Sequence, residues 1–133
     1  MTSHRKFVIA ALVGAASAAA APGSSWAQPD HPTENACFAR TLVESFSAPN
    51  DRTVYLRVGV SDIYRLDLMK NCLNLSYRDS LGLEEQPATG FICSPLEATV
   101  VYRVNGIRER CPVTAIHKLT KSEIAATPKR DLP

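Results

Sequence analysis

An even number of cysteines constrains the possible folds of this 133-residue chain more than any other feature. In a short exported protein, such a set is typical of a disulfide framework rather than of catalysis or metal binding. No CxxC motif occurs, so thioredoxin-type redox chemistry and a zinc knuckle both lack their ligand spacing. We therefore predict two disulfide bonds among the four cysteines, which are Cys37, Cys72, Cys93 and Cys111.

The start of the chain has the three parts of a secretory signal peptide. Residues 1–6 give a short cationic start, residues 7–21 form a run of small and apolar side chains, and Ser25-Trp26-Ala27 provides a small-x-small cleavage pattern. The apolar run is shorter than the ~20 residues that a membrane-spanning helix needs. We predict cleavage between Ala27 and Gln28, a periplasmic or secreted location, and no transmembrane segment in the mature chain.

Removal of residues 1–27 changes the charge balance and defines the domain. Of the 15 basic residues 13 remain, against 13 acidic residues, so the mature chain is formally neutral and gives no indication of nucleic-acid binding. Its length allows one domain with a modest core, to which each disulfide bond would add ~3 kcal/mol in the chain-entropy model. We predict a disordered lead at 28–36, a single β-rich domain at 37–126 and a flexible tail at 127–133.

Two stretches of alternating apolar residues predict a first hairpin. Residues 53–58 and 64–68 each place apolar side chains at every second position, as half-buried strands do. If the apolar faces match across the hairpin, Leu56 opposes Leu66. That register also places Arg57 opposite Arg65, on the outer face.

The dipeptide Asn105-Gly106 predicts a second hairpin, because both residues tolerate the positive φ of a type I′ turn. Its arms are residues 98–104 and 107–116. Counting outward from the turn pairs Val104 with Ile107 and Val100 with Cys111. The same register turns Tyr102 inward, places Arg103 opposite Arg108, and leaves Arg110 on the same face as Arg108.

Shorter segments complete the predicted architecture. Residues 73–77 and 90–93 each suit a short strand, separated by a loop at 78–89, and residues 37–46 suit either a strand or a short helix. Thr120-Lys121-Ser122-Glu123 is a capping box that predicts a short C-terminal helical turn. The chain is therefore expected to be all-β and mainly antiparallel: a small disulfide-linked, partly closed barrel or a sandwich of five or six short strands.

The second hairpin also restricts the disulfide pairing. Four cysteines allow three pairings. Along the ladder Cys93 and Cys111 would lie roughly 23 Å apart at ~3.3 Å per residue, against the ~7 Å between Cα atoms that a bridge allows. A bend at Ser94-Pro95 would reduce this distance, so the Cys93–Cys111 pairing ranks last. We favour Cys37–Cys111 with Cys72–Cys93, and Cys37–Cys93 with Cys72–Cys111 remains open.

The order of these motifs resembles an uncharacterised domain-of-unknown-function family of small exported bacterial proteins with four cysteines. The resemblance extends from Cys37 to about Ile124. It rests on Asp-Arg-Thr-Val at the start of a strand (residues 51–54), on Phe91-Ile92-Cys93, and on Arg-Cys-Pro-Val at residues 110–113. The resemblance implies a bacterial source and a periplasmic or extracellular location. It implies no activity, cofactor or catalytic residue.

The sequence contains no catalytic or metal-binding constellation that we identify. The mature chain has two histidines, His31 in the lead and His117 in a strand, and no Gly-x-Ser-x-Gly, HExxH or phosphate-binding glycine loop. A strand histidine that faces solvent is the simplest interpretation of His117. We therefore expect a protein that is not an enzyme and has no cofactor and no metal.

The candidate binding residues are five arginines on the outer faces of the two hairpins. Like charges in opposed positions destabilise a ladder unless the long side chains separate and pair diagonally, here with Asp67 or Glu109. The donors of a guanidinium group fit the oxygen atoms of phosphate and carboxylate groups. The more specific hypothesis is therefore that these arginines form an anion-binding face. Its members are Arg57, Arg65, Arg103, Arg108 and Arg110.

Three classes of function follow from this pattern. We expect first a non-catalytic binding or interaction module, with an anionic envelope polymer, a lipid or a protein as its partner. An inhibitor of a secreted or envelope hydrolase is the alternative, presenting the loop at 78–89. An enzyme ranks third, and a pocket that combines His117 with a carboxylate would support it.

Overall fold

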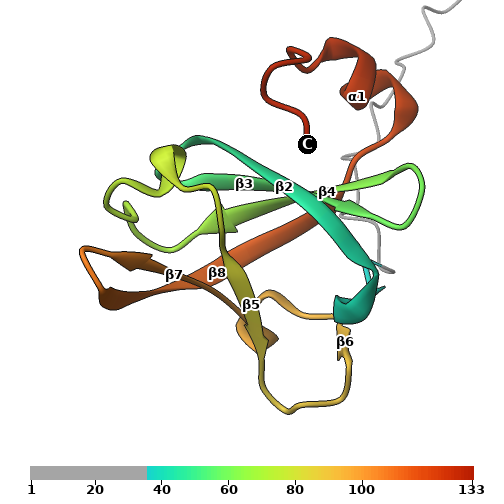
Figure 1. The fold of residues 1–133 in the computed structure, drawn as a ribbon. Coiled ribbons are helices and arrows are strands. Elements are labelled where there is room, and N and C mark those ends of the chain that lie inside the picture. The colour runs from blue at the N-terminus through green and yellow to red at the C-terminus, as the bar shows by residue number, and fades with distance from the viewer. Residues whose placement is uncertain (1–35) are drawn as a thin grey trace, which may run out of the picture.

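A computed structural model describes residues 36–133, so the predicted signal peptide, its cleavage site and the predicted lead as far as residue 35 lie outside the described residues. Six strands form one antiparallel sheet in the order β2-β3-β4-β8-β7-β5, which curls into half a barrel (Figure 1). Two short strands, β1 and β6, form a second sheet. The predicted all-β, partly closed architecture with two disulfide bonds is confirmed. The strands are β1 (Phe38–Ala39), β2 (Val43–Asn50), β3 (Thr53–Val58), β4 (Asp62–Leu68), β5 (Gly82–Glu85), β6 (Phe91–Ile92), β7 (Ala98–Val104) and β8 (Ile107–Lys118).

The core lies inside the curl of the large sheet. Alternate residues of β3 and β4 point into it, and Val54, Leu56 and Leu66 are completely buried there. Val100 and Val113 enter the same core from β7 and β8. Burying each such side chain contributes roughly 1.5–3 kcal/mol, so the alternating pattern contributes substantially to the stability of this fold.

The first hairpin forms, but the predicted register is wrong by two residues. Leu56 pairs with Tyr64 and Leu66 with Val54, and Arg57 lies opposite Ile63 rather than opposite Arg65. The reason is the turn, which contains only residues 59–61 because Val58 already pairs with Asp62. A shift of two residues keeps every side chain on its face, so the predicted buried face is unchanged.

The second hairpin forms in the predicted register. Val104 pairs with Ile107, Arg103 with Arg108 and Val100 with Cys111. At the turn, Asn105 and Gly106 have φ values of 51° and 83°, as a type I′ turn requires.

The disulfide bonds differ from the favoured pairing. Cys37 is bonded to Cys93 and Cys72 to Cys111, with Cα atoms 4.0 Å and 6.2 Å apart. The pairing of Cys37 with Cys111 and of Cys72 with Cys93 is therefore wrong, and the alternative that remained open is the one found. The ladder of β1 and β6 gives the reason. Phe38 pairs with Ile92, which places the preceding Cys37 beside the following Cys93.

Three local predictions also need correction. Residues 73–77 contain the 3-10 helix η2 (Leu75–Tyr77) instead of a strand, and residues 78–89 include β5 instead of forming a loop throughout. Between residues 37 and 46 the chain forms β1, the 3-10 helix η1 (Arg40–Leu42) and the start of β2, so it is neither one strand nor one helix. A further 3-10 helix, η3 (Pro95–Glu97), precedes β7.

The C-terminal segment lies against the outer face of the first hairpin. The capping box at Thr120 is present and begins α1 (Lys121–Ala126), as predicted. Before it, the Leu119 N–H donates to the Ile63 carbonyl at 2.8 Å. Pro133 is half-buried and its carbonyl oxygen accepts a hydrogen bond from Arg57. The flexible tail at 127–133 stays a prediction. Within residues 36–133, no helix has the length and hydropathy needed to cross a membrane.

Candidate anion-binding cleft

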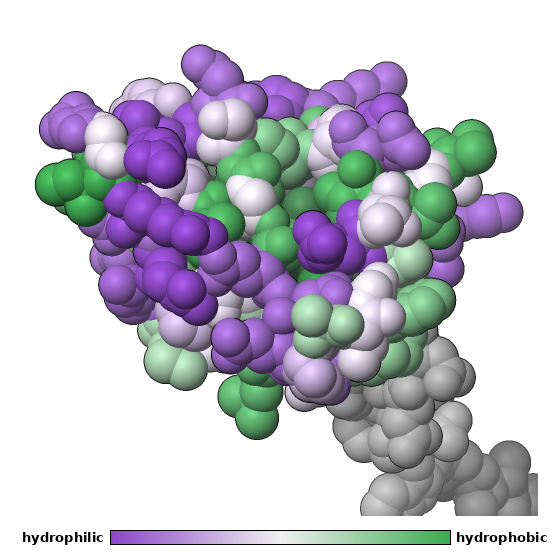
Figure 2. All heavy atoms as spheres, turned by 60° about the horizontal axis from the view of Figure 1, so that its bottom comes forward, coloured by the Kyte–Doolittle hydropathy of each residue, from purple (hydrophilic) through white to green (hydrophobic). Residues whose placement is uncertain are grey.

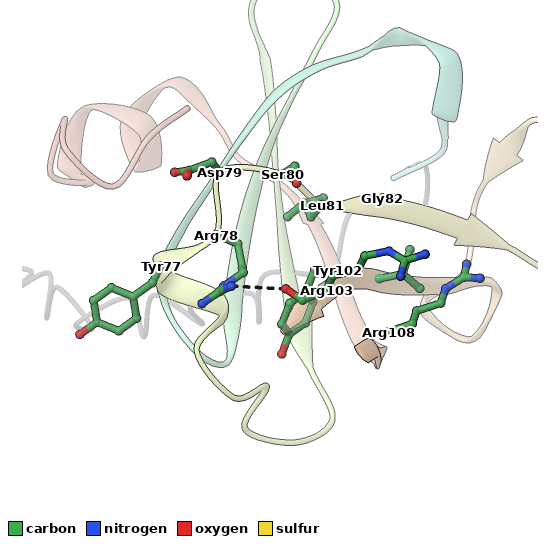
Figure 3. Close-up of a pocket in the computed structure, with 10 residues that line it drawn as sticks. Tyr77, Arg78, Asp79, Ser80, Leu81, Gly82, Tyr102, Arg103 and Arg108 are labelled. Atoms are coloured by element: carbon green, nitrogen blue, oxygen red, sulfur yellow. Dashed lines mark hydrogen bonds between the residues drawn. The ribbon is translucent and has the colours of Figure 1, made fainter. Parts of the chain in front are cut away.

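A cleft of about 610 Å³ opens where the chain passes from η2 into β5 (Figure 3). One wall is the segment at 77–82, and the other is the β7–β8 hairpin. Three guanidinium groups line it, and Asp79 is the only acidic residue of its lining. The cationic residues are Arg78, Arg103 and Arg108.

Arg78 extends from the end of η2 toward the hairpin (Figure 3). Its Nε donates to the Asn74 carbonyl oxygen at 2.9 Å, and its Nη1 donates to the Arg103 carbonyl oxygen at 3.3 Å. Asn74 itself adopts a left-handed conformation with φ of 59°, which ends the preceding segment and starts η2. Two backbone carbonyl groups therefore hold this guanidinium in place without neutralising its charge.

Arg103 and Arg108 project from opposed positions of the hairpin and have different partners. Arg103 donates through Nη1 to the Gly106 carbonyl oxygen at 3.0 Å, inside its own turn. Arg108 forms an ion pair with Glu84 of β5, and the same carboxylate lies 2.9 Å from Arg110 Nη1. One carboxylate thus serves two guanidinium groups. Among residues 36–133, neither Arg78 nor Arg103 forms an ion pair.

Two tyrosines complete the cleft. Tyr102 points inward, as predicted, with 4% of its surface exposed, and its hydroxyl donates to the Leu73 carbonyl oxygen at 3.0 Å. Burial raises the pKa of Tyr102, so this hydroxyl stays protonated and neutral. Tyr77 is 78% exposed at the edge of the cleft. The cleft therefore combines the positive charge of its arginines with one exposed aromatic ring, whereas the Tyr102 hydroxyl is already engaged by Leu73.

A family model matches residues 3–131, and it describes a family of unknown function, DUF6491. The chain belongs to the DUF6491 family. No curated protein and no solved structure matches the chain. The predicted resemblance to an uncharacterised family is therefore confirmed, whereas the bacterial source, export and a family pattern of four cysteines stay predictions.

The DUF6491 domain brings together only part of the predicted arginine face. Arg103 and Arg108 line the cleft, and Arg110 lies beside it on Glu84. Arg57 and Arg65 belong to the other hairpin. Arg57 donates to the Pro133 carbonyl oxygen, and Arg65 Nη2 lies 3.3 Å from Asp67 Oδ2. These two arginines have partners of their own and do not line the cleft.

Arg78 is the cleft residue that the sequence did not indicate. It lies in a segment with no periodic pattern, and the Cys72–Cys111 disulfide bond and the Tyr102–Leu73 hydrogen bond connect the chain just before it to the hairpin. The same segment was the predicted inhibitory loop. Because Gly82–Glu85 pair with β7, the part that stays a loop before β6 is much shorter than predicted.

His117 lies away from the cleft and interacts with a helix cap. Its Nε2 is 2.8 Å from Glu123 Oε1, and Glu123 also accepts from the Thr120 N–H at 2.7 Å. These hydrogen bonds lower the pKa of Glu123 to about 2. His117 therefore does not face solvent freely, and its carboxylate partner is engaged in capping α1. In the part of the chain that the structure describes, no cluster of three His, Cys, Asp or Glu residues is arranged to hold a metal ion.

Proposed function

We propose that this DUF6491 protein is an exported, non-catalytic module that binds an anionic component of the cell envelope in the Arg78–Arg103 cleft. The proposal rests on the interaction partners of the Arg78 and Arg103 guanidinium groups. Both are held by backbone carbonyl groups, and neither has a carboxylate partner among the described residues. Their positive charge is therefore free to meet a ligand.

The chemistry of guanidinium defines the ligand class. Its planar fork of donors matches the oxygen atoms of a phosphate or a carboxylate, and such charge-assisted hydrogen bonds are about twice as strong as neutral ones. Arg108 adds a third donor group close to Arg103, partly neutralised by Glu84. The ligand should carry at least one phosphate or carboxylate group, on either a polymer or a lipid.

The cysteines support the proposed compartment. All four are paired in disulfide bonds, which persist in oxidising environments and are rare in the cytosol. An exported domain of this kind meets anionic polymers and lipids of the envelope.

A charge-reversal experiment tests the proposal. The variant Arg103→Glu with Arg108→Glu is compared with Lys129→Glu plus Arg130→Glu, which changes the net charge equally at exposed positions outside the cleft. At low salt, wild type and the control should bind envelope fractions, and the cleft variant should lose binding. Separate lipid and polymer fractions distinguish the two sources of anion. Equal binding by the cleft variant would exclude the proposed function.

A further inference from the structure

The large sheet leaves two edges unpaired, and one of them has free hydrogen-bonding groups. β5 pairs with β7 alone, and β2 pairs with β3 alone. The Gln86 N–H donates to the Glu97 carbonyl oxygen at 2.9 Å, on the β7 side. Because N–H and C=O groups alternate in direction along an antiparallel strand, the backbone groups of Leu83 and Glu85 point away from β7. They form no backbone hydrogen bond within the described residues.

A cleft of about 240 Å³ lies between the two edges, and its lining combines apolar side chains with Arg40, Glu44 and Ser45. Val43 and Phe46 of β2 line one side, Leu81 and Leu83 line the other, and Leu56 belongs to the lining from β3. The β2 and β5 ribbons diverge toward the β1–β6 sheet (Figure 1). On the face drawn in Figure 2, apolar side chains gather in a central hollow with a hydrophilic border. The open side of the half-barrel thus presents apolar side chains, with charged residues among them, beside an unpaired strand.

Buried polar atoms without partners occur on both edge strands. Among the described residues, only three buried side-chain atoms have no hydrogen-bond partner, and two of them are Ser45 Oγ on β2 and Glu85 Oε2 on β5. The Glu85 side chain is 5% exposed, and its other oxygen accepts from the Gly90 N–H. Arg40 Nε lies 3.6 Å from Glu85 Oε2, which is an ion-pair distance but too long for a hydrogen bond. A buried acceptor of this kind favours a ligand that supplies a donor.

We propose that the β5 edge binds an extended peptide segment of a partner protein, which pairs with Leu83 and Glu85 as a seventh strand. Strand addition of this kind obtains affinity from backbone hydrogen bonds and specificity from alternate side chains. The peptide residue opposite Leu83 is apolar and enters the cleft. The residue two positions along faces the same side and is basic, because it meets Glu85 Oε2.

The β2 edge is less suited to this role. Pro49 has no N–H to donate, and a strand that contains a proline is less able to pair with another strand. The peptide is therefore assigned to β5. This surface adjoins the arginine cleft at Leu81, which lines both, but the proposal does not depend on the function proposed above.

A short capped peptide tests the proposal on the mature protein. The probe is acetyl-Thr-Val-Thr-Arg-Thr-amide, with valine and arginine two positions apart. Controls replace its arginine by glutamate, or carry N-methyl groups on the valine and arginine nitrogens that would pair with β5. We expect the arginine peptide to bind about tenfold more tightly than the glutamate peptide, and the N-methylated peptide not to bind.

Two further measurements separate recognition from folding. Hydrogen exchange should show that the peptide protects the amides of Leu83 and Glu85. The Glu85→Gln variant keeps the shape of the side chain and should bind the arginine and glutamate peptides within about threefold of each other. Equal binding of the N-methylated peptide, or an unprotected β5 edge, would overturn the proposal. A concentration-dependent dimer with the same amides protected would overturn it also, because a second copy would then be the occupant.

Discussion

Arg103 lies directly opposite Arg108 in the β7–β8 ladder, and of the two only Arg108 forms an ion pair with Glu84. Opposed like charges cost a few tenths to about 1 kcal/mol of stability. Arg103 is not compensated by a carboxylate within the described residues, and Arg78 approaches it from the other wall of the cleft. The hairpin therefore concentrates positive charge at a place where stability alone would favour removing it.

Removing Arg103 should stabilise the domain. Arg103→Gln should raise the free energy of unfolding by a few tenths of a kcal/mol to about 1 kcal/mol, because the repulsion with Arg108 disappears. The matched control is Arg110→Gln, which loses a pair with Glu84 and should lower the stability by up to about 1 kcal/mol. Urea unfolding of both variants measures the difference. If Arg103→Gln were the less stable variant, Arg103 would be part of the scaffold rather than of a binding site.

The two disulfide bonds should be reduced in a fixed order. Cys72 and Cys111 are buried, whereas Cys37 and Cys93 are exposed, and a thiolate must reach the sulfur that it attacks. Mild reductant should therefore open Cys37–Cys93 first. Alkylation followed by peptide mapping at increasing reductant concentrations gives the order, and the fully oxidised map checks the connectivity itself. Simultaneous labelling of all four cysteines would show that burial does not control their access.

Glu123 should make the C-terminal segment sensitive to acid. Its pKa is lowered from 4.5 to about 2 by the Thr120 and His117 hydrogen bonds. Because its pKa is lowered in the folded protein, the stabilising contribution of the Glu123 carboxylate is complete above about pH 4.5. This contribution is lost as the pH falls toward 2. Amide exchange in α1 should therefore accelerate through this window.

The control for this effect is Glu123→Gln, which keeps an acceptor at the capping position and cannot titrate there. Its α1 exchange should change less between pH 4.5 and 2 than that of wild type. Parallel curves for the two proteins would mean that other carboxylates cause the acid response.

A side chain at position 82 should destabilise the domain. A Cβ atom at this position would lie 2.9 Å from Val101 Cγ2, across the β5–β7 pair. Gly82→Ala should therefore cost about 1–3 kcal/mol, as overpacking does. In a Val101→Ala background the clashing methyl group is absent, so the cost of Gly82→Ala should fall, and thermal unfolding of the four proteins in this cycle measures the coupling. Equal costs in both backgrounds would exclude the close contact as the cause.

Prediction from the sequence succeeded where a local rule determines the geometry. A two-residue turn at Asn105-Gly106 sets the register of its whole hairpin, so the position of Arg103 opposite Arg108 follows from counting. The turn at Gly59 has no such signature, and the register there was misplaced by two residues. The buried and exposed faces of this hairpin were nevertheless predicted correctly, because side chains on a strand alternate between faces with a period of two.

Prediction was wrong where a contact between distant segments decides the structure. The pairing of Cys37 with Cys93 depends on the two-residue strands β1 and β6, which are too short to show a pattern. Similarly, Arg78 reaches the cleft because the Cys72–Cys111 disulfide bond and the Tyr102–Leu73 hydrogen bond connect the chain just before it to the hairpin. The sequence therefore indicated two of the three arginines that line the cleft, and the structure supplied the third.

The most direct test of the anion cleft is an NMR titration of the arginine side chains with inorganic polyphosphate at low salt. The Nε–H signals of Arg78 and Arg103 should shift with a common dissociation constant, and those of Arg57 and Arg65, which have other partners, should move little. Added salt should reverse the shifts, because the interaction is electrostatic. Equal shifts at all four arginines, or none at Arg78 and Arg103, would contradict a binding site in this cleft.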